Sequence, residues 1–95
     1  MYNLIIRDRA QLMLDEAYLW YEQKSPGLGE RLLQEVINGF QNLQNRPDYY
    51  TKSKENYRQL ILKQFPYKIV FEIIGTDVIV YSIFHTSRNP ENLFG

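Results

Sequence analysis

The chain has 95 residues, of which 44% are hydrophobic and 23% charged, and its 11 basic residues balance 11 acidic ones. A chain of this length can bury about one small hydrophobic core, so we expect a single domain over residues 1–95. The absence of cysteine excludes disulfides and thiolate metal sites, and a single histidine argues against zinc, so we expect neither a metal nor a cofactor. No apolar run approaches the ~20 residues that span a bilayer, and residues 1–10 lack a signal-peptide pattern, so we expect a cytoplasmic protein that does not contact the membrane.

The N-terminal part of the chain predicts a short strand and a first helix. Residues 2–7 form a β-rich run. Asp8 is followed three residues later by Gln11, a capping-box pattern that opens a helix expected to run to about Gln23. The apolar side chains of this helix recur every three or four residues and form one stripe of Ala10, Met13, Leu14, Ala17 and Tyr21.

A second helix is expected after a short break. The sequence KSPG ends the first helix, and Ser25 and Pro26 suit the N-cap and the first turn of the second. Pro47 ends the second helix. Its apolar positions keep the helical period and are Leu28, Leu32, Leu33, Val36, Ile37, Phe40 and Leu43. Two antiparallel helices joined by a short turn are therefore expected.

The second half of the chain has the pattern of strands. Residues 48–56 are polar and turn-like, and three strands are expected at 57–64, 67–74 and 78–84. Pro66 marks a bend between the first two, because proline cannot donate a hydrogen bond to a neighbouring strand. The apolar and polar residues alternate weakly, so we expect the central strands to be covered on both faces. The prediction is an α+β fold of order β-α-α-β-β-β, with a helical hairpin packed on a small, largely antiparallel sheet.

Positive charge is concentrated in one segment of the chain. Residues 46–68 carry six basic residues against Asp48 and Glu55, a balance of +4. The six are Arg46, Lys52, Lys54, Arg58, Lys63 and Lys68. Such a segment could face phosphate, because clustered cations supply the sequence-independent part of nucleic-acid binding. The alternative is a loop and strand whose basic side chains are simply solvated.

A run of four large side chains in the first helix contains three aromatic residues. Tyr18, Leu19, Trp20 and Tyr21 are consecutive and cover most of the helix circumference, so they cannot all enter one core. They either pack against the second helix and the following loop or form a protein-binding surface, since tryptophan and tyrosine are favoured interface anchors.

His85 and Arg88 follow the last predicted strand. His85 is the single histidine, and Arg88 is the single cation after Lys68. Metal-free RNA cleavage needs a base, an acid and cations for the phosphate, and His85 could serve as base or acid while Arg88, Arg58, Lys63 or Lys68 holds phosphate. The alternative is structural, with His85 bonded to a backbone carbonyl and Arg88 paired with a carboxylate or covering an apolar patch.

The order of elements and two sequence stretches together resemble the RelE/ParE superfamily of bacterial toxins. The stretches are YRQLILKQFPYKIVFEI and the ending IFHTSRNP, and the resemblance runs from residue 2 to about residue 94. It implies the toxin of a type II toxin–antitoxin pair, of the kind associated with plasmid stabilisation and growth arrest. A cognate antitoxin is expected to neutralise it, and operator DNA is expected to be contacted only through that antitoxin.

Free toxins of this superfamily either cleave messenger RNA on the ribosome or inhibit DNA gyrase. By resemblance, Arg88 matches the late arginine of the nucleases and Lys68 lies near the arginine of their middle strand. The position of their late proton-transfer residue falls on Phe94, which cannot transfer a proton, and a net charge of zero disfavours docking on a ribosome. The ParE-like branch is therefore favoured, in which the toxin is a non-enzymatic inhibitor that binds gyrase.

The candidate site residues follow from these patterns. We expect the basic strand and the C-terminal segment to lie together on one edge or face of the sheet, where the target-binding residues are Arg58, Lys63, Lys68, His85, Arg88, Leu93 and Phe94. The expected antitoxin-binding residues are Tyr18, Trp20 and Tyr21. The alternatives are a ribosome-dependent mRNA endoribonuclease with His85 and Arg88 as catalytic residues, or a decayed toxin fold that only binds its antitoxin.

Overall fold

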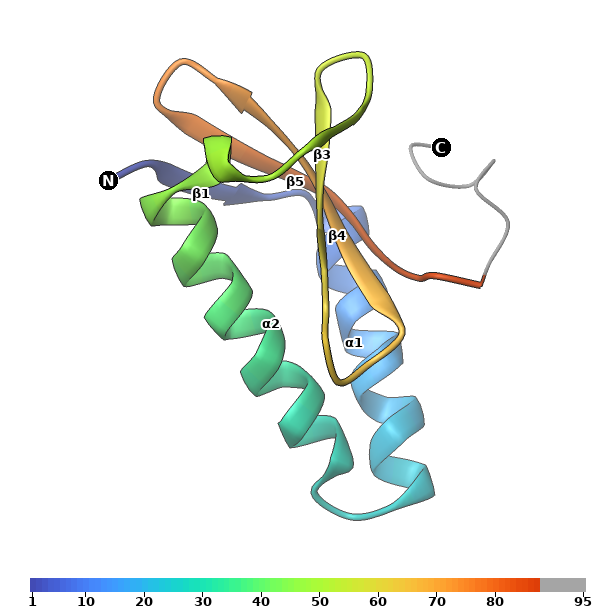
Figure 1. Cartoon of the computed structure of the whole chain (residues 1–95). Coiled ribbons are helices and arrows are strands. Elements are labelled where there is room, and N and C mark those ends of the chain that lie inside the picture. The colour runs from blue at the N-terminus through green and yellow to red at the C-terminus, as the bar shows by residue number, and fades with distance from the viewer. Residues whose placement is uncertain (88–95) are drawn as a thin grey trace.

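The computed structural model describes residues 1–87 and confirms an α+β fold with a helical hairpin on a largely antiparallel sheet (Figure 1). The elements in chain order are β1 (Asn3–Ile6), α1 (Asp8–Lys24), α2 (Leu28–Asn45), the 3-10 helix η1 (Pro47–Tyr49), β2 (Lys52–Lys54), β3 (Tyr57–Ile61), β4 (Tyr67–Ile74) and β5 (Asp77–His85). One strand was not expected: β2 lies within the segment predicted to be a polar turn. Its three side chains are all exposed, so it carries no alternation of apolar and polar residues by which the sequence could indicate a strand.

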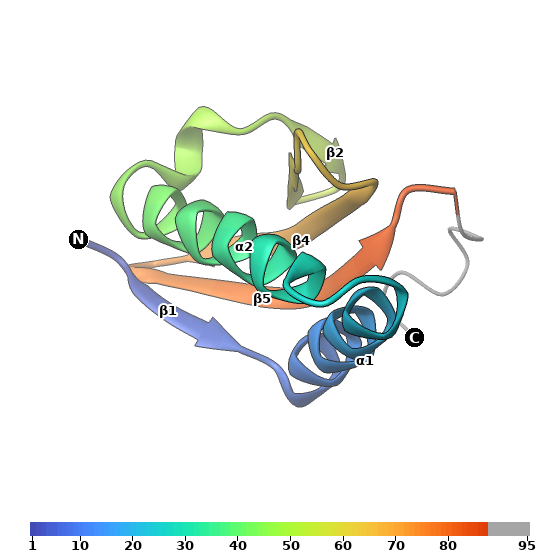
Figure 2. The same cartoon turned by 90° about the horizontal axis from the view of Figure 1, so that it is seen from below.

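The strands form one sheet in the order β1-β5-β4-β3-β2. Neighbouring strands are antiparallel except β1 and β5, which run parallel with Ile6 opposite Val80. The β4–β5 hairpin turns at Gly75, whose φ of 60° suits a residue without a Cβ. Both helices lie against the sheet (Figure 2).

The core lies between the helical hairpin and the sheet. Its members include Leu14 and Ala17 of α1, Leu32, Val36 and Leu43 of α2, and Leu60, Ile69, Phe71, Val78, Val80 and Ile83 of the sheet. Three consecutive residues of β4, Ile69 to Phe71, are buried, as the weak alternation in this strand indicated. Each large apolar side chain that is fully removed from water contributes about 1.5–3 kcal/mol to folding, so this layer is the main source of stability.

The start of α1 differs from the predicted capping box. Arg7 is the N-cap, and its side chain makes no capping hydrogen bond. Asp8 lies in the first turn, where its charge still favours the positive end of the helix dipole. The Gln11 amide donates to Asp15 Oδ1 at 3.0 Å instead of bonding back to the N-cap, so the capping-box prediction was wrong.

The turn between the helices was also misassigned. Ser25 is the C-cap of α1 and not the N-cap of α2, and Pro26 precedes α2. The N-cap of α2 is Gly27, whose φ of 90° is the left-handed conformation that glycine adopts without strain.

The first turn of α2 is capped by a carboxylate from the other helix. Oxygens of Glu22, near the end of α1, accept the backbone N–H of Gly27 at 3.2 Å, of Gly29 at 2.7 Å and of Glu30 at 3.2 Å. These hydrogen bonds, the one from Gly27 above all, lower the pKa of Glu22 below its ordinary value of 4.5. The carboxylate thus satisfies N–H groups that have no partner inside the helix.

Glu22→Gln should therefore lower the melting temperature at neutral pH by several degrees, because an amide offers one acceptor oxygen and no charge to α2. A carboxyl whose folded pKa is depressed contributes stability above its unfolded pKa and loses it as the pH falls through the folded value. The difference in melting temperature between the two proteins should accordingly shrink as the pH falls below 4.5. Glu16→Gln is the control, since it removes the same charge earlier in α1; a pH-independent difference for Glu22→Gln would contradict the capping role.

Within residues 1–87 no helix is long and apolar enough to cross a membrane.

Candidate functional site

His85 ends β5 and is held by its neighbours. It lies opposite Tyr67 of β4, and the two rings meet edge to face with centroids 5.3 Å apart. The backbone N–H of Ser87 donates to His85 Nδ1 at 3.1 Å. This bond occupies Nδ1 and leaves Nε2 as the ring nitrogen that can face another partner. The structural alternative predicted that His85 bonds to a backbone carbonyl. The observed bond is instead donated by a backbone N–H, that of Ser87.

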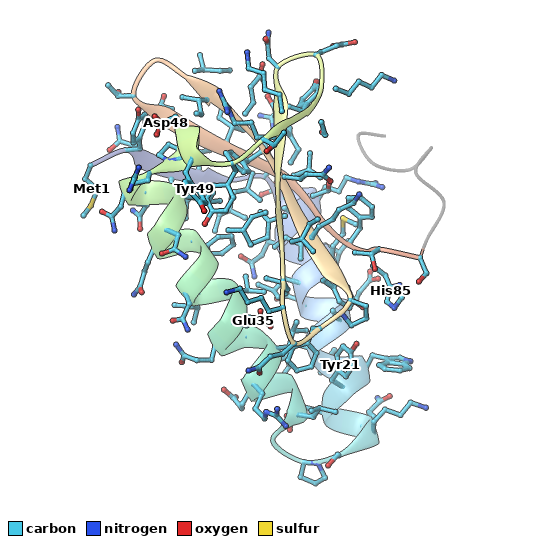
Figure 3. The ribbon with its side chains drawn as sticks, viewed as in Figure 1. Met1, Tyr21, Glu35, Asp48, Tyr49 and His85 are labelled. Atoms are coloured by element: carbon cyan, nitrogen blue, oxygen red, sulfur yellow. The ribbon has the colours of Figure 1, made fainter. Side chains whose placement is uncertain are left out.

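A pocket of about 330 Å³ opens beside His85. It is lined by Trp20, Tyr21, Tyr67, His85 and Ser87. Figure 3 shows Tyr21 and His85 at the same end of the molecule. Two predicted surfaces therefore meet here, because Trp20 and Tyr21 were expected to bind the antitoxin and His85 the target.

Tyr21 is the anchor of this corner. Its ring contacts those of Phe65, Tyr67 and Trp20 edge to face, with centroids 5.1, 6.2 and 4.9 Å apart. Tyr21 is half-buried, whereas Trp20 is 52% exposed, and the Lys24 ammonium lies 4.9 Å from its ring centroid. The rigid ring cluster thus presents Trp20 outward.

The helix α1 exposes two leucines besides Trp20, among charged residues such as Glu16 and Lys24. Leu12 and Leu19 of the same helix are 57% and 58% exposed. A second, smaller pocket of about 140 Å³ lies on the other side of the tryptophan and is lined by Met13, Glu16, Ala17, Trp20, Tyr67 and Ile83. Trp20 therefore borders two hollows. A partner that covered its ring and the exposed leucines would remove apolar surface from water, which is favourable.

Tyr18 has a different role from its neighbours. Its hydroxyl donates to Glu30 Oε1 at 2.6 Å and joins the two helices. Ionisation of the Tyr18 phenol would break this bond and place a second negative charge beside the Glu30 carboxylate. The bond therefore raises the pKa of Tyr18 to about 12. Tyr18 lines neither of the pockets beside Trp20.

Arg58 is engaged inside the fold. Its guanidinium Nη1 donates to the carbonyl oxygens of Asp48 at 3.3 Å and Tyr50 at 2.6 Å. It therefore clamps the segment around η1 to β3. Arg58 lies opposite Phe71, a core residue, so its side chain leaves the sheet on the helix side.

Lys63 lies in the connection between β3 and β4. Its backbone N–H donates to Glu35 Oε2 at 2.6 Å, and that of Gln64 donates to Glu35 Oε1 at 3.2 Å. The Glu35 carboxylate, visible in Figure 3, thus fastens the hairpin connection to α2. The Lys63 side chain is exposed.

Lys68 is on the sheet face away from the helices. It lies opposite Ile61 and Phe84, and its Nζ is 5.0 Å from the Phe84 ring centroid. Because side chains alternate along a strand, Lys68 and its neighbour Tyr67, which contacts His85, point to opposite faces. Arg88, Leu93 and Phe94 lie outside the described residues.

A family model described as the ParE toxin of the type II toxin–antitoxin system parDE matches residues 4–90, most of the chain. The chain belongs to the ParE toxin family. A search of the curated proteins finds no match.

Three solved structures share the ParE-like fold. A chain of the chromosomal ParDE system from P. aeruginosa is 20% identical, with a TM-score of 0.81 over 92% of this chain and 98% of that one. A chain of the intact E. coli RelBE toxin–antitoxin complex is 16% identical, with a TM-score of 0.57 over 93% and 100% of the two chains. The isolated E. coli RelE toxin is also 16% identical, with a TM-score of 0.56 over 94% and 88%.

The described part of this ParE-family toxin does not surround His85 with cations. Arg58 is committed to backbone carbonyls on the helix side, Lys63 lies in the β3–β4 connection beside α2, and Lys68 faces the opposite side of the sheet. Within residues 1–87 no three histidine or carboxylate side chains are arranged to hold a metal ion. Most of the side chains that line the pocket beside His85 are aromatic rings, which suit packing against another molecule.

Sequence reasoning missed two features of this corner. Tyr67 lines both pockets beside Trp20, but it was read only as the first residue of a strand. Its signal was the FPY sequence, because Phe65 and Tyr67 both contact Tyr21. The second feature is a sheet edge: β1 pairs only as far as Val80, and no strand of the described chain lies beside residues 81–85 on that side.

Proposed function

We propose that this chain is a cytoplasmic toxin that a cognate antitoxin neutralises and that, when free, binds and inhibits DNA gyrase without catalysing a reaction itself. Membership of the ParE family over residues 4–90 supports the toxin assignment. The observation that carries the choice of a binding mechanism concerns Arg58 and Lys68. The Arg58 guanidinium is bonded to backbone carbonyls, and Lys68 lies on the face of the sheet opposite the His85 ring.

RNA cleavage makes demands that this arrangement meets poorly. It needs a base, an acid and cations held near the same phosphate. His85 Nδ1 already accepts the Ser87 N–H, and Lys68 lies over Phe84 on the other face. Binding to a protein target requires only a complementary surface with suitable charges. His85 and Lys68 can contribute to such a surface in the positions that they occupy.

The proposed target surface wraps around the end of the central strands instead of occupying one face as expected, because Lys68 and His85 lie on opposite faces of the sheet. It comprises Lys63, Lys68 and His85, together with Arg88, Leu93 and Phe94 of the C-terminal segment. We assign Arg58 an indirect role in it, because its guanidinium holds the segment around η1 on β3.

The proposed antitoxin surface is the exposed face of α1 with the neighbouring edge of β5. Trp20 and Tyr21 provide aromatic anchors, and Tyr18 supports them by joining α1 to α2. An extended antitoxin segment could pair with residues 81–85 while its apolar side chains fill the hollows beside Trp20. Operator DNA would then be reached only through the antitoxin.

An SOS-response reporter in a bacterial host tests the function. Induction of the chain without antitoxin should arrest growth and induce the reporter, because a stalled gyrase leaves broken DNA. The double variant Lys68→Ala/Arg88→Ala should reduce reporter induction at least tenfold if the charged half of the target surface is correct. Arg9→Ala/Arg31→Ala removes the same charge at exposed positions and should remain toxic. Full toxicity of the first variant at equal protein level would exclude Lys68 and Arg88 from the target surface.

One observation favours a second function. Tyr21, Tyr67 and His85 place two phenols and an imidazole around one pocket, and these are groups that can transfer protons. A ribosome-dependent mRNA endoribonuclease would arrest growth without SOS induction, and His85→Gln would abolish cleavage of a translated messenger RNA.

A further inference from the structure

A second pocket lies at the end of α2, away from His85. It has a volume of about 400 Å³ and is lined by Asn42, Asn45, Arg46, Tyr49 and Tyr50. Figure 3 shows Tyr49 beside Asp48 and apart from Tyr21 and His85. None of these five residues takes part in the proposed target or antitoxin surface, so the pocket calls for its own explanation.

The pocket exposes an aromatic ring beside a cation. Tyr49 is 72% exposed, and the Arg46 guanidinium lies 5.8 Å from its ring centroid. The side-chain amides of Asn42 and Asn45 offer both donors and acceptors beside the ring. A ring face, a cation and paired amide groups are the elements that recognise a planar ligand with hydrogen-bonding edges and a negative charge.

The segment that carries Tyr49 is held firmly. Pro47 is fully buried, and Tyr50 packs edge to face on the core residue Phe71 with ring centroids 6.1 Å apart. Arg58 donates to the carbonyl oxygens on both sides of Tyr49, those of Asp48 and Tyr50. Little backbone freedom is therefore left for a ligand to remove on binding, which favours affinity.

Positive charge continues from the pocket along the sheet edge. Residues 46–54 carry Arg46, Lys52 and Lys54 against Asp48, a balance of +2. Lys52 and Lys54 are exposed on β2, the edge strand next in the chain. Lysines on an edge strand also prevent strand pairing between molecules, but that role does not account for an exposed tyrosine on a clamped segment or for the amide-lined pocket.

We propose that this pocket and the adjoining β2 edge bind single-stranded nucleic acid. One base stacks on Tyr49 and pairs with the amides of Asn42 or Asn45, while neighbouring phosphates lie against Arg46 and against Lys52, which pairs with Arg58 on the helix side of the sheet. A duplex fits less well, because its bases are stacked inside the helix and cannot enter a pocket of about 400 Å³. An acidic peptide would satisfy the cations but leave the ring without a stacking partner. The proposal is independent of the toxin's target.

Fluorescence anisotropy with the full chain tests the proposal. The probe is a labelled oligodeoxythymidine of about 12 nucleotides, compared with a duplex of the same length. Tyr49→Ala should weaken binding of the single strand about tenfold or more, whereas Tyr49→Phe should retain it, because stacking needs the ring and not the hydroxyl. Arg46→Ala should reduce the slope of log Kd against log salt concentration by about 0.7.

Two controls keep the result interpretable. Trp20→Ala removes an exposed aromatic residue that does not line this pocket and should leave binding unchanged, and circular dichroism verifies that each variant is folded. The proposal is overturned if the single strand does not bind at physiological salt, if Tyr49→Ala binds as the wild type does, or if polyglutamate competes as well as the oligonucleotide. The first result would mean that the edge is a solvated basic surface, and either of the other two that it attracts anions without stacking a base on Tyr49.

Discussion

Trp20→Ala should weaken the complex with the cognate antitoxin by at least about 30-fold, the effect expected of an interface tryptophan whose loss costs about 2 kcal/mol or more. The physical reason is that Trp20 is 52% exposed between two hollows, so a partner can bury a large ring that the free toxin leaves in water. The measurement is the Kd of purified toxin variants for the antitoxin by titration calorimetry.

The matched control for this experiment is Tyr49→Ala. It also removes an exposed aromatic ring, but in the pocket at the end of α2, which shares no lining residue with the two pockets beside Trp20, and it should leave the antitoxin affinity unchanged. Because Trp20 projects from α1 instead of filling the core, its variant should retain nearly all of its thermal stability. Unchanged affinity in a folded Trp20→Ala protein would place the antitoxin on another surface.

Gly29→Ala should be the most destabilising of these substitutions, lowering the free energy of unfolding by about 3 kcal/mol and the melting temperature by more than about 10 °C. A Cβ at this position would lie 2.6 Å from the backbone oxygen of Tyr18 and 2.6 Å from Glu22 Cγ. A backbone oxygen inside a helix cannot move alone, so α1 and α2 must separate. The separation also pulls the Glu22 carboxylate away from the N–H groups that it caps.

Gly39→Ala is the matched control in the same helix. Its Cβ would meet the tips of Ile69 and Leu60 at 3.3 Å, and those flexible side chains can shift by a few tenths of an ångström. Alanine also gains about 1 kcal/mol of helix propensity over glycine, which offsets the crowding. Thermal unfolding should therefore show a change within about 1 kcal/mol for Gly39→Ala. Equal losses for the two variants would mean that helix contact at Gly29 is not what limits stability.

The periodic elements were predictable from the sequence because their signals are local. The apolar stripes of α1 and α2 recur every three or four residues, and the β4 and β5 strands flank a glycine turn. Their order and the FPY and HTSRNP sequences were sufficient to indicate the RelE/ParE superfamily, which the match over residues 4–90 confirms.

Helix caps and the edge strand were not predictable in the same way. The Glu22 carboxylate caps a helix to which it does not belong, and no rule for the first residues of α2 can identify such a partner. The strand β2 is short and fully exposed, so only its pairing with β3 distinguishes it from a turn.

The sequence by itself determined which residues could form a site: one histidine, an aromatic run in α1 and a basic segment in the second half. Only the tertiary structure decided which of them meet. Packing of α1 against the end of β5 places Trp20 and Tyr21 beside His85, across more than 60 residues of chain. The same fold separates Arg58, which is drawn to backbone carbonyls on the helix side, from Lys68 on the far face of the sheet. The reason is that composition and periodicity depend on neighbours along the chain, whereas hydrogen-bond partners and shared surfaces depend on which elements the hydrophobic core brings together.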